Sequence, residues 1–199
     1  MIQNTIIATD ENIRQLISSE IANLGRKANL NHIDVSLVTN MTKLFSNSTF
    51  NGDISKWNTS KVEDMSLMFW RSEFNGDISN WSLNSVRTAN LMFAMSYFNN
   101  DISRWDVSNV KHMDECFAYS NFNGDISKWD VSSVISMSRI FMESNFNQDI
   151  SGWKFNPNLY IDTDLHHIIE QSHFKKQKTE SKLLKQSISN LITKPFISL

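Results

Sequence analysis

Cys116 and His112 come closest in this chain to a nucleophile and its base. Cys116 is the single cysteine, and His112 precedes it by four residues, so one helical turn would bring thiol and imidazole together. A reactive thiolate, however, needs a partly exposed, electropositive setting. Positions separated from Cys116 by multiples of 24 residues are apolar: Leu44, Met68, Met92 and Ile140. We therefore expect Cys116 to be a buried hydrophobic residue.

Regularly spaced aspartates are candidate calcium ligands. They recur every 24 residues, at Asp53, Asp77, Asp101, Asp125 and Asp149. A calcium site collects several carboxylate and carbonyl oxygens around one ion, whereas each 24-residue segment supplies one aspartate in this column. A carboxylate in an Asn-x-Asp turn can instead accept backbone N–H groups. We expect the turn role and predict no metal site.

The serines and histidines lack the pattern of a catalytic or zinc site. Serine occurs in every segment, at Ser55, Ser79, Ser103, Ser127 and Ser151 and again at Ser48, Ser72, Ser96, Ser120 and Ser144. A catalytic serine would occur once, beside a histidine and an aspartate. His173 follows His166 and His167 by seven and six residues, not by the four of a zinc-binding helix. We predict a chain that is not an enzyme and binds no cofactor.

All these positions belong to one repeated phrase, Phe-Asn-x-Asp-Ile-Ser-x-Trp. Its five copies begin 24 residues apart, at Phe50, Phe74, Phe98, Phe122 and Phe146. A fixed period of this length is typical of stacked-repeat proteins, in which equivalent side chains lie on one another. The phenylalanines and tryptophans of the phrase are therefore predicted to form the core.

Each repeat is predicted to contain a short strand and a short helix. Ile102–Val107 carries the isoleucine, tryptophan and valine of a strand, and Val110, Met113 and Phe117 form a helical stripe that Ser108 could cap. Strands pair at about 4.8 Å, whereas packed helices lie about 8–10 Å apart. The array should then curve, with its strands on the inner face.

The predicted fold class is therefore α/β, a leucine-rich-repeat-like solenoid of 24-residue strand–turn–helix units with helical caps. Residues 1–25 form the N-terminal capping helix, which starts at Thr9-Asp10-Glu11 and ends at Gly25. Residues 26–157 form about five and a half rungs, the first of them degenerate over 26–49. Residues 158–199 form a C-terminal helical cap or tail, with helical patterns from Thr163 and over 179–192.

The repeat resembles the BspA-like leucine-rich-repeat surface proteins, including the repeats associated with palindromic amphipathic repeat coding elements. Their unit reads Asp-[Val/Thr]-Ser-x-Val-x-x-Met-x-x-Met-Phe, followed by the Phe-Asn-x-Asp-Ile-Ser-x-Trp phrase. Residues 106–110 match its start, and Met65, Met68 and Phe69 match its end. The resemblance covers about residues 26–157. It implies a leucine-rich-repeat-like solenoid and adhesion or host-factor binding.

The composition limits the compartment and the kinds of partner. The net charge is −2 and there is one cysteine, so a disulfide framework is excluded and a clustered basic face is not indicated. No apolar run reaches the roughly 18–20 residues that cross a bilayer, and no signal peptide is visible at Met1. We expect no membrane insertion and a cytoplasmic location by default, with export by a non-classical route or a secretion system also compatible.

One variable column suggests a binding face. Lys56, Asn80, Arg104 and Lys128 lie between the serine and tryptophan of successive copies and should point to solvent. Trp70 is a second candidate contact, because other copies have Ser46, Ala94, Ala118 and Met142 in its place.

We therefore predict a non-enzymatic protein that binds another macromolecule, and a protein partner fits the mixed charges best. An adhesin, an effector and an interaction module all agree with this pattern. The alternative is a calcium- or zinc-binding or enzymatic site in the C-terminal segment. A further alternative is nucleic-acid binding by the Lys175–Lys185 tail, which the acidic balance disfavours.

Overall fold

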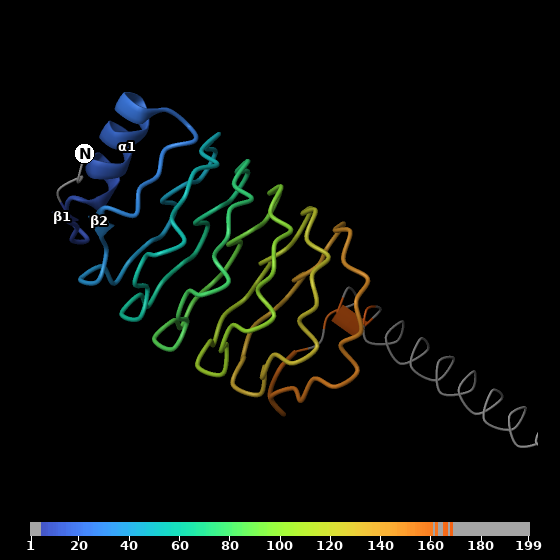
Figure 1. Ribbon diagram of the computed structural model, residues 1–199. Coiled ribbons are helices and arrows are strands. Elements are labelled where there is room, and N and C mark those ends of the chain that lie inside the picture. Colours follow the sequence, from blue (N-terminus) through green and yellow to red (C-terminus); the bar gives the residue numbers. More distant parts are fainter. Residues whose placement is uncertain (1–4, 161, 163–164, 167, 169–199) are drawn as a thin grey trace, which may run out of the picture.

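The computed structural model describes residues 5–160, 162, 165, 166 and 168. Residues 165, 166 and 168 are helical, and the helix and strands labelled in Figure 1 lie at the N-terminal end. Strand β1 (Ile6–Ile7) leads into helix α1 (Ile13–Leu24), and strand β2 (Ile33–Asp34) pairs with β1 in parallel. Beyond β2 the chain winds into a stack of similar coils (Figure 1). The leucine-rich-repeat class of this stack stays a prediction.

Backbone hydrogen bonds join the coils along one segment of each 24-residue repeat. We call residues 41–47, 65–71, 89–95, 113–119 and 137–143 the ladder segments. In the first four ladder segments, every second N–H donates to a carbonyl of the next coil, as from Phe69 to Met92 (2.9 Å) and from Arg71 to Ala94 (3.0 Å). Parallel bridges between residues 24 apart, such as Asp64 with Thr88, mark the start of each ladder segment. Neighbouring coils are therefore held in a fixed register.

The helix predicted for each repeat is wrong, because its residues form the ladder segment. Leu91 and Met95 have φ values of 55° and 56°, and the Met92 N–H donates to the Ala89 carbonyl in a tight turn. Alternating turns of this kind direct N–H groups toward the next coil, whereas a helix would consume them internally. The Ser108 cap is also wrong, since the Ser108 N–H donates to the Asp106 carboxylate.

The predicted strand is likewise wrong, and the described residues lack the outer layer of helices from which the curvature was predicted. Trp105 donates its N–H to the Ile102 carbonyl, 3.1 Å away, so this stretch contains a turn. Ring centroids repeat at 5.5–5.8 Å along the column that starts at Phe45. They repeat at 6.2–6.4 Å along the columns that start at Phe50 and Trp57. Such nearly equal spacings leave no room for a layer of helices 8–10 Å apart.

The aromatic columns form the core, as the repeat pattern predicts. Phe69, Phe93 and Phe117 are fully buried and stack nearly parallel, with interplanar angles of 7°. Each tryptophan of the repeated phrase is also tied to the preceding coil, because its indole Nε1 donates to a carbonyl 27 residues earlier at 2.9–3.1 Å. These pairs are Trp57 with Leu30, Trp81 with Ile54, Trp105 with Ile78, Trp129 with Ile102 and Trp153 with Ile126. Burial and a directed hydrogen bond therefore act on the same side chains.

The asparagine at the second position of the phrase forms a column that links neighbouring coils. The side-chain oxygen of Asn75 accepts the Asn99 N–H, and that of Asn99 accepts the Asn123 N–H, at 2.9 and 2.8 Å. The same bond joins Asn51 to Asn75 and Asn123 to Asn147. The asparagine of the phrase is thus a structural connector between coils.

The N-terminal cap covers the first coil, as predicted, with one change at its start. Helix α1 buries Ile13 and Ile17 in the core and ends at Gly25, whose φ is 85°. The helix begins after Asn12, not at Asp10. The Asp10 carboxylate instead accepts the N–H groups of Thr39 and Asn40, at 2.8 and 3.0 Å. It thereby takes the place of a carbonyl from a preceding coil, since the Thr39 carbonyl accepts the corresponding N–H groups of the next one.

At the other end, residues after the last ladder segment continue the stack. The Asp162 carboxylate accepts the Arg139 N–H. Leu165 is buried in the same core as the aromatic columns. The predicted helix over 179–192 lies outside the described residues, as does most of the one predicted from Thr163.

Replacing Phe117 by alanine should lower the free energy of unfolding by about 3–5 kcal/mol, because a fully buried ring leaves a cavity between two neighbouring rings. Chemical denaturation followed by tryptophan fluorescence measures the change. Leu37→Ala, at a side chain that is 50% exposed, is the control and should cost far less. Equal losses for the two variants would contradict the assignment of the core.

Asp10→Ala should cost about 1–2 kcal/mol at neutral pH, a range that allows for solvent screening of this exposed group. Desolvation opposes ionisation, but the hydrogen bonds from Thr39 and Asn40 outweigh it and lower the pKa of Asp10. Because the folded-state pKa lies below the unfolded value of about 3.9, the stabilisation is complete above that value. It is lost as the pH falls through the folded pKa.

The stability difference between wild type and Asp10→Ala should therefore shrink in acid. Thermal melts from neutral pH down to about pH 2 test this. Glu11→Ala, at the exposed neighbouring carboxylate, is the control. A difference that stays constant across this range would exclude the capping role of the ionised Asp10.

Candidate binding surface

Lys56, Asn80, Arg104 and Lys128, here called the polar stripe, are all exposed on successive coils. Each lies between a turn and a buried tryptophan. In every copy of the phrase, the aspartate carboxylate accepts the N–H of the serine two residues later, at 2.8–3.0 Å. These aspartates are Asp53, Asp77, Asp101, Asp125 and Asp149. The tryptophan that follows each stripe residue is buried in the core. The predicted turn role of these aspartates is confirmed, and the exposed position of the stripe follows from it.

Hydrogen bonds and neighbouring cations lower the pKa of Asp101 and Asp125 beside the polar stripe. The N–H of Ser103 is the largest cause of the lowered pKa of Asp101, and the Arg104 cation adds to it. Asp125 shows the same pattern, with Ser127 first and Lys128 contributing. Each cation of the stripe thus lies beside an anion of its own coil. The surface is a row of alternating charges with little net charge.

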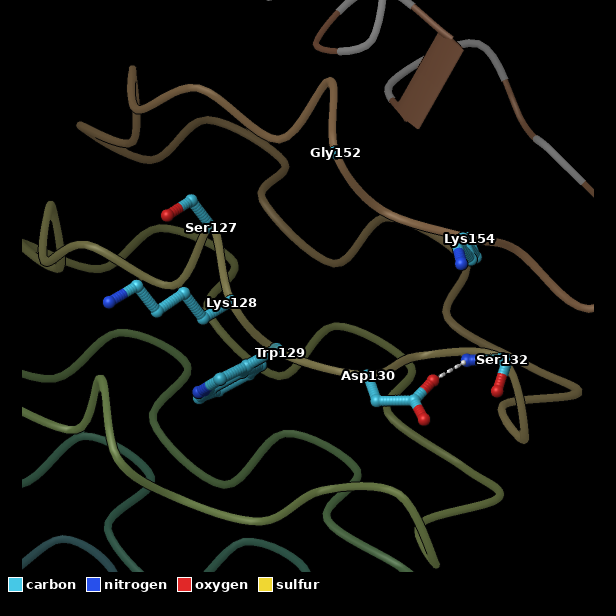
Figure 2. Close-up of a pocket in the computed structure, with 7 residues that line it drawn as sticks. All are labelled: Ser127, Lys128, Trp129, Asp130, Ser132, Gly152 and Lys154. Carbon is cyan, nitrogen blue, oxygen red and sulfur yellow. Dashed lines mark hydrogen bonds between the residues drawn. The ribbon is translucent and has the colours of Figure 1, made fainter.

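A hollow lies at the end of the polar stripe (Figure 2). Gly152 occupies the position that Lys128 holds one coil earlier, so the last coil lacks a stripe side chain. The resulting cavity has a volume of about 580 Å³ and is lined by Ser127, Lys128, Trp129, Asp130, Ser132, Gly152 and Lys154. Lys128 and Lys154 lie on opposite sides of it. The hollow can receive a side chain from a bound molecule.

One carboxylate, that of Asp130, lies in this hollow together with the two lysines. Asp130 accepts the Ser132 N–H at 3.0 Å. The side-chain hydrogen bond from Ser132 is the largest cause of its lowered pKa, and the Lys154 cation contributes. The hollow therefore offers both a cationic and an anionic group beside the nearly buried Trp129.

Trp70, the second predicted contact, is less exposed than expected. It lies on a ladder segment, not on a helix, and it is half-buried. The Arg71 guanidinium covers part of its ring, with Cζ 4.6 Å from the ring centroid. This cation–π contact accounts for the coverage of the indole.

Cys116 has the buried position that its column predicts. It is 1% exposed, and desolvation raises the pKa of its thiol to about 12. The thiolate form is therefore negligible near neutral pH. Cys116 fills space in the core and is not a nucleophile.

No metal centre is formed by the residues that the structure describes. Among them, no group of three or more histidine, cysteine, aspartate or glutamate side chains could hold a metal ion. His166 is exposed, while His167 and His173 lie outside the described part of the chain. The alternative of a metal or enzymatic site in the C-terminal segment likewise falls mostly on residues outside it.

One exposed apolar surface was not predicted from the sequence. Met95, Tyr97 and Tyr119 are 39%, 62% and 46% exposed and lie on or next to neighbouring ladder segments. Met95 and Tyr119 share their column with Arg71 and Glu143, so no apolar pattern in the sequence marked this surface. The expectation of a helix there obscured which of its residues face outward.

The chain was compared with protein families, curated proteins and solved structures. The family described as "Mycoplasma protein of unknown function, DUF285" matches residues 12–119 and 94–163. No curated protein and no solved structure matches. In the described part of the chain, no helix is both long and apolar enough to span a bilayer. The two matched ranges include α1 and the coils, and the chain belongs to the DUF285 family.

Proposed function

We propose that this chain is a non-enzymatic binding protein that recognises another protein through the polar stripe. The single observation that carries the proposal is the row of exposed side chains at Lys56, Asn80, Arg104 and Lys128, repeated at the spacing of the coils. A row of this kind presents several contacts to one partner at the same time.

The rigidity of the scaffold supports this proposal. Each stripe residue is bounded by an Asp–Ser turn on one side and by a hydrogen-bonded tryptophan on the other, as Arg104 is by Asp101 and Trp105. Contacts held in place before binding lose little conformational entropy when the partner arrives. A fixed row can therefore bind with useful affinity although each contact is weak.

The charge pattern favours a protein over a nucleic acid. Nucleic-acid surfaces require clustered cations without nearby anions. Here Asp53, Asp101 and Asp125 are ionised next to the stripe cations. A surface of alternating sign complements a protein that also carries both charges, and it disfavours partners with the wrong arrangement.

The resemblance to BspA-like surface repeats points the same way. It supports a leucine-rich-repeat-like solenoid that acts as an adhesin, an effector or an interaction module. Stacked-repeat proteins commonly bind through a surface that extends over several repeats, and the polar stripe has this form.

The triple variant Lys56→Glu, Arg104→Glu, Lys128→Glu should reduce partner capture at least about tenfold, because reversed charges would face the partner's anions. The full chain is immobilised, and proteins captured from extracts of the producing organism and of candidate host cells are quantified by mass spectrometry. The matched control is Lys27→Glu, Lys43→Glu, Lys61→Glu, which makes the same change of charge at exposed positions outside the stripe.

Melting temperatures of both triple variants establish that they are folded. Capture lost only by the stripe variant supports the proposal. If the stripe variant retains every partner that the control retains, the polar stripe is not the binding surface.

A further inference from the structure

A second exposed column lies on the outer side of the ladder segments. It contains Asn47, Arg71, Met95, Tyr119 and Glu143, all of them exposed. We call the last four, which lie on four successive coils, the ladder column. Backbone hydrogen bonds fix their alignment: the N–H groups of Arg71, Met95 and Tyr119 each donate to the next coil, at 3.0, 2.8 and 2.7 Å. The four side chains therefore form a row with one member per coil.

The chemical order along this row is cation, apolar, aromatic, anion. Consider a second copy of the chain facing this surface, related by a two-fold axis that runs across the row between Met95 and Tyr119. The axis reverses the row, so Arg71 lies opposite Glu143 of the partner subunit. Met95 then lies opposite Tyr119 of the partner subunit. Such a self-complementary surface is the requirement for a closed, symmetric dimer.

The adjacent column obeys the same symmetry. It contains Trp70, Ala94, Ala118 and Met142. Reversal places Trp70 opposite Met142 of the partner subunit, and Ala94 opposite Ala118 of the partner subunit. Ala94 and Ala118 are buried within each subunit, so no side chain of this column projects between the two copies at the centre. The partly exposed indole and thioether provide apolar area on either side.

Other charged side chains around this surface are already paired within one subunit, whereas, among the described residues, those at the two ends of the ladder column are not. Glu115 and Arg139 pair with each other at 3.8 Å, and Arg26 pairs with Glu73 at 3.1 Å, so both pairs are neutral within one subunit. Arg71 instead contacts the Trp70 ring and the Met95 sulfur. Neither Arg71 nor Glu143 forms an ion pair within the described part of the chain. A second copy supplies the partner that each of them lacks.

We infer that the ladder column is the interface of a two-fold symmetric homodimer of this chain. The exposed apolar side chains Met95, Tyr97 and Tyr119 provide the area that is removed from water. The Arg71–Glu143 contacts at the two ends fix the antiparallel register. This interface uses a different surface from the polar stripe and does not depend on the proposed function.

The experiment is a set of charge exchanges followed by sedimentation equilibrium of the full chain, from about 1 to 300 µM. The wild type is expected to show a monomer–dimer equilibrium within this range. Arg71→Glu and Glu143→Arg should each weaken association at least about tenfold, since two like-charged contacts then face each other in every dimer. The double variant, which has the net charge of the wild type, should recover the association.

A mixture of the two single variants provides the sharpest readout. Each variant alone would be impaired, because position 71 of one subunit and position 143 of the other then carry the same charge. In the mixture, a chain with Arg71→Glu faces a chain with Glu143→Arg, so both end contacts become attractive. A heterodimer is therefore expected. Arg104→Glu, an equal charge reversal on the polar stripe, is the control and should leave association unchanged.

One outcome supports the inferred dimer, and the others overturn it. Loss in the single variants with recovery in both the double variant and the mixture supports the inferred dimer. A wild type that stays monomeric throughout the concentration range overturns it. So does a dimer that the single variants leave intact, or one that the charge exchange fails to restore, with folding of every variant verified by its melting temperature.

Discussion

The distance between neighbouring coils is the constraint on which this molecule depends. Hydrogen bonds from alternate N–H groups of the first four ladder segments hold the next coil at a strand-like separation. At this separation every side chain meets its own counterpart in the next coil. A column that links the coils must therefore consist of side chains that can pack against, or hydrogen-bond to, identical residues in the neighbouring coils. Flat aromatic rings do so by stacking, and asparagines do so because an amide oxygen can accept the N–H of the next asparagine.

Much of the interior could be predicted from the repeat, whereas the backbone path could not. Stacking of Phe69 on Phe93 and the burial of Cys116 follow from the 24-residue period alone. The spacing of Val110, Met113 and Phe117 suits a helix, but a series of turns buries the same residues. Positive φ values at Leu91 and Glu115 make those turns possible. Neither residue type signals that conformation, which normally selects glycine or asparagine.

The surface could be predicted only in part, for the same reason. Arg104 and its equivalents are exposed because the neighbouring aspartate and tryptophan are fixed by the phrase itself. The hollow beside Lys128 depends on a missing side chain at Gly152 and on the end of the stack. The outward direction of Met95 and Tyr119 depends on the turns of the ladder segments. The pattern therefore located the columns that the 24-residue period aligns, and it missed the features that depend on the backbone turns and on the end of the stack.

The Trp105–Ile78 hydrogen bond and its equivalents have a consequence for how such a chain can change in length. Each tryptophan of the repeated phrase bonds to the coil directly before it, so these contacts are the same from one coil to the next. Insertion or deletion of a whole 24-residue unit therefore leaves both termini and all neighbour contacts equivalent. The length of the polar stripe, and with it the number of contacts it offers, is therefore set by the number of repeats, and the core need not change.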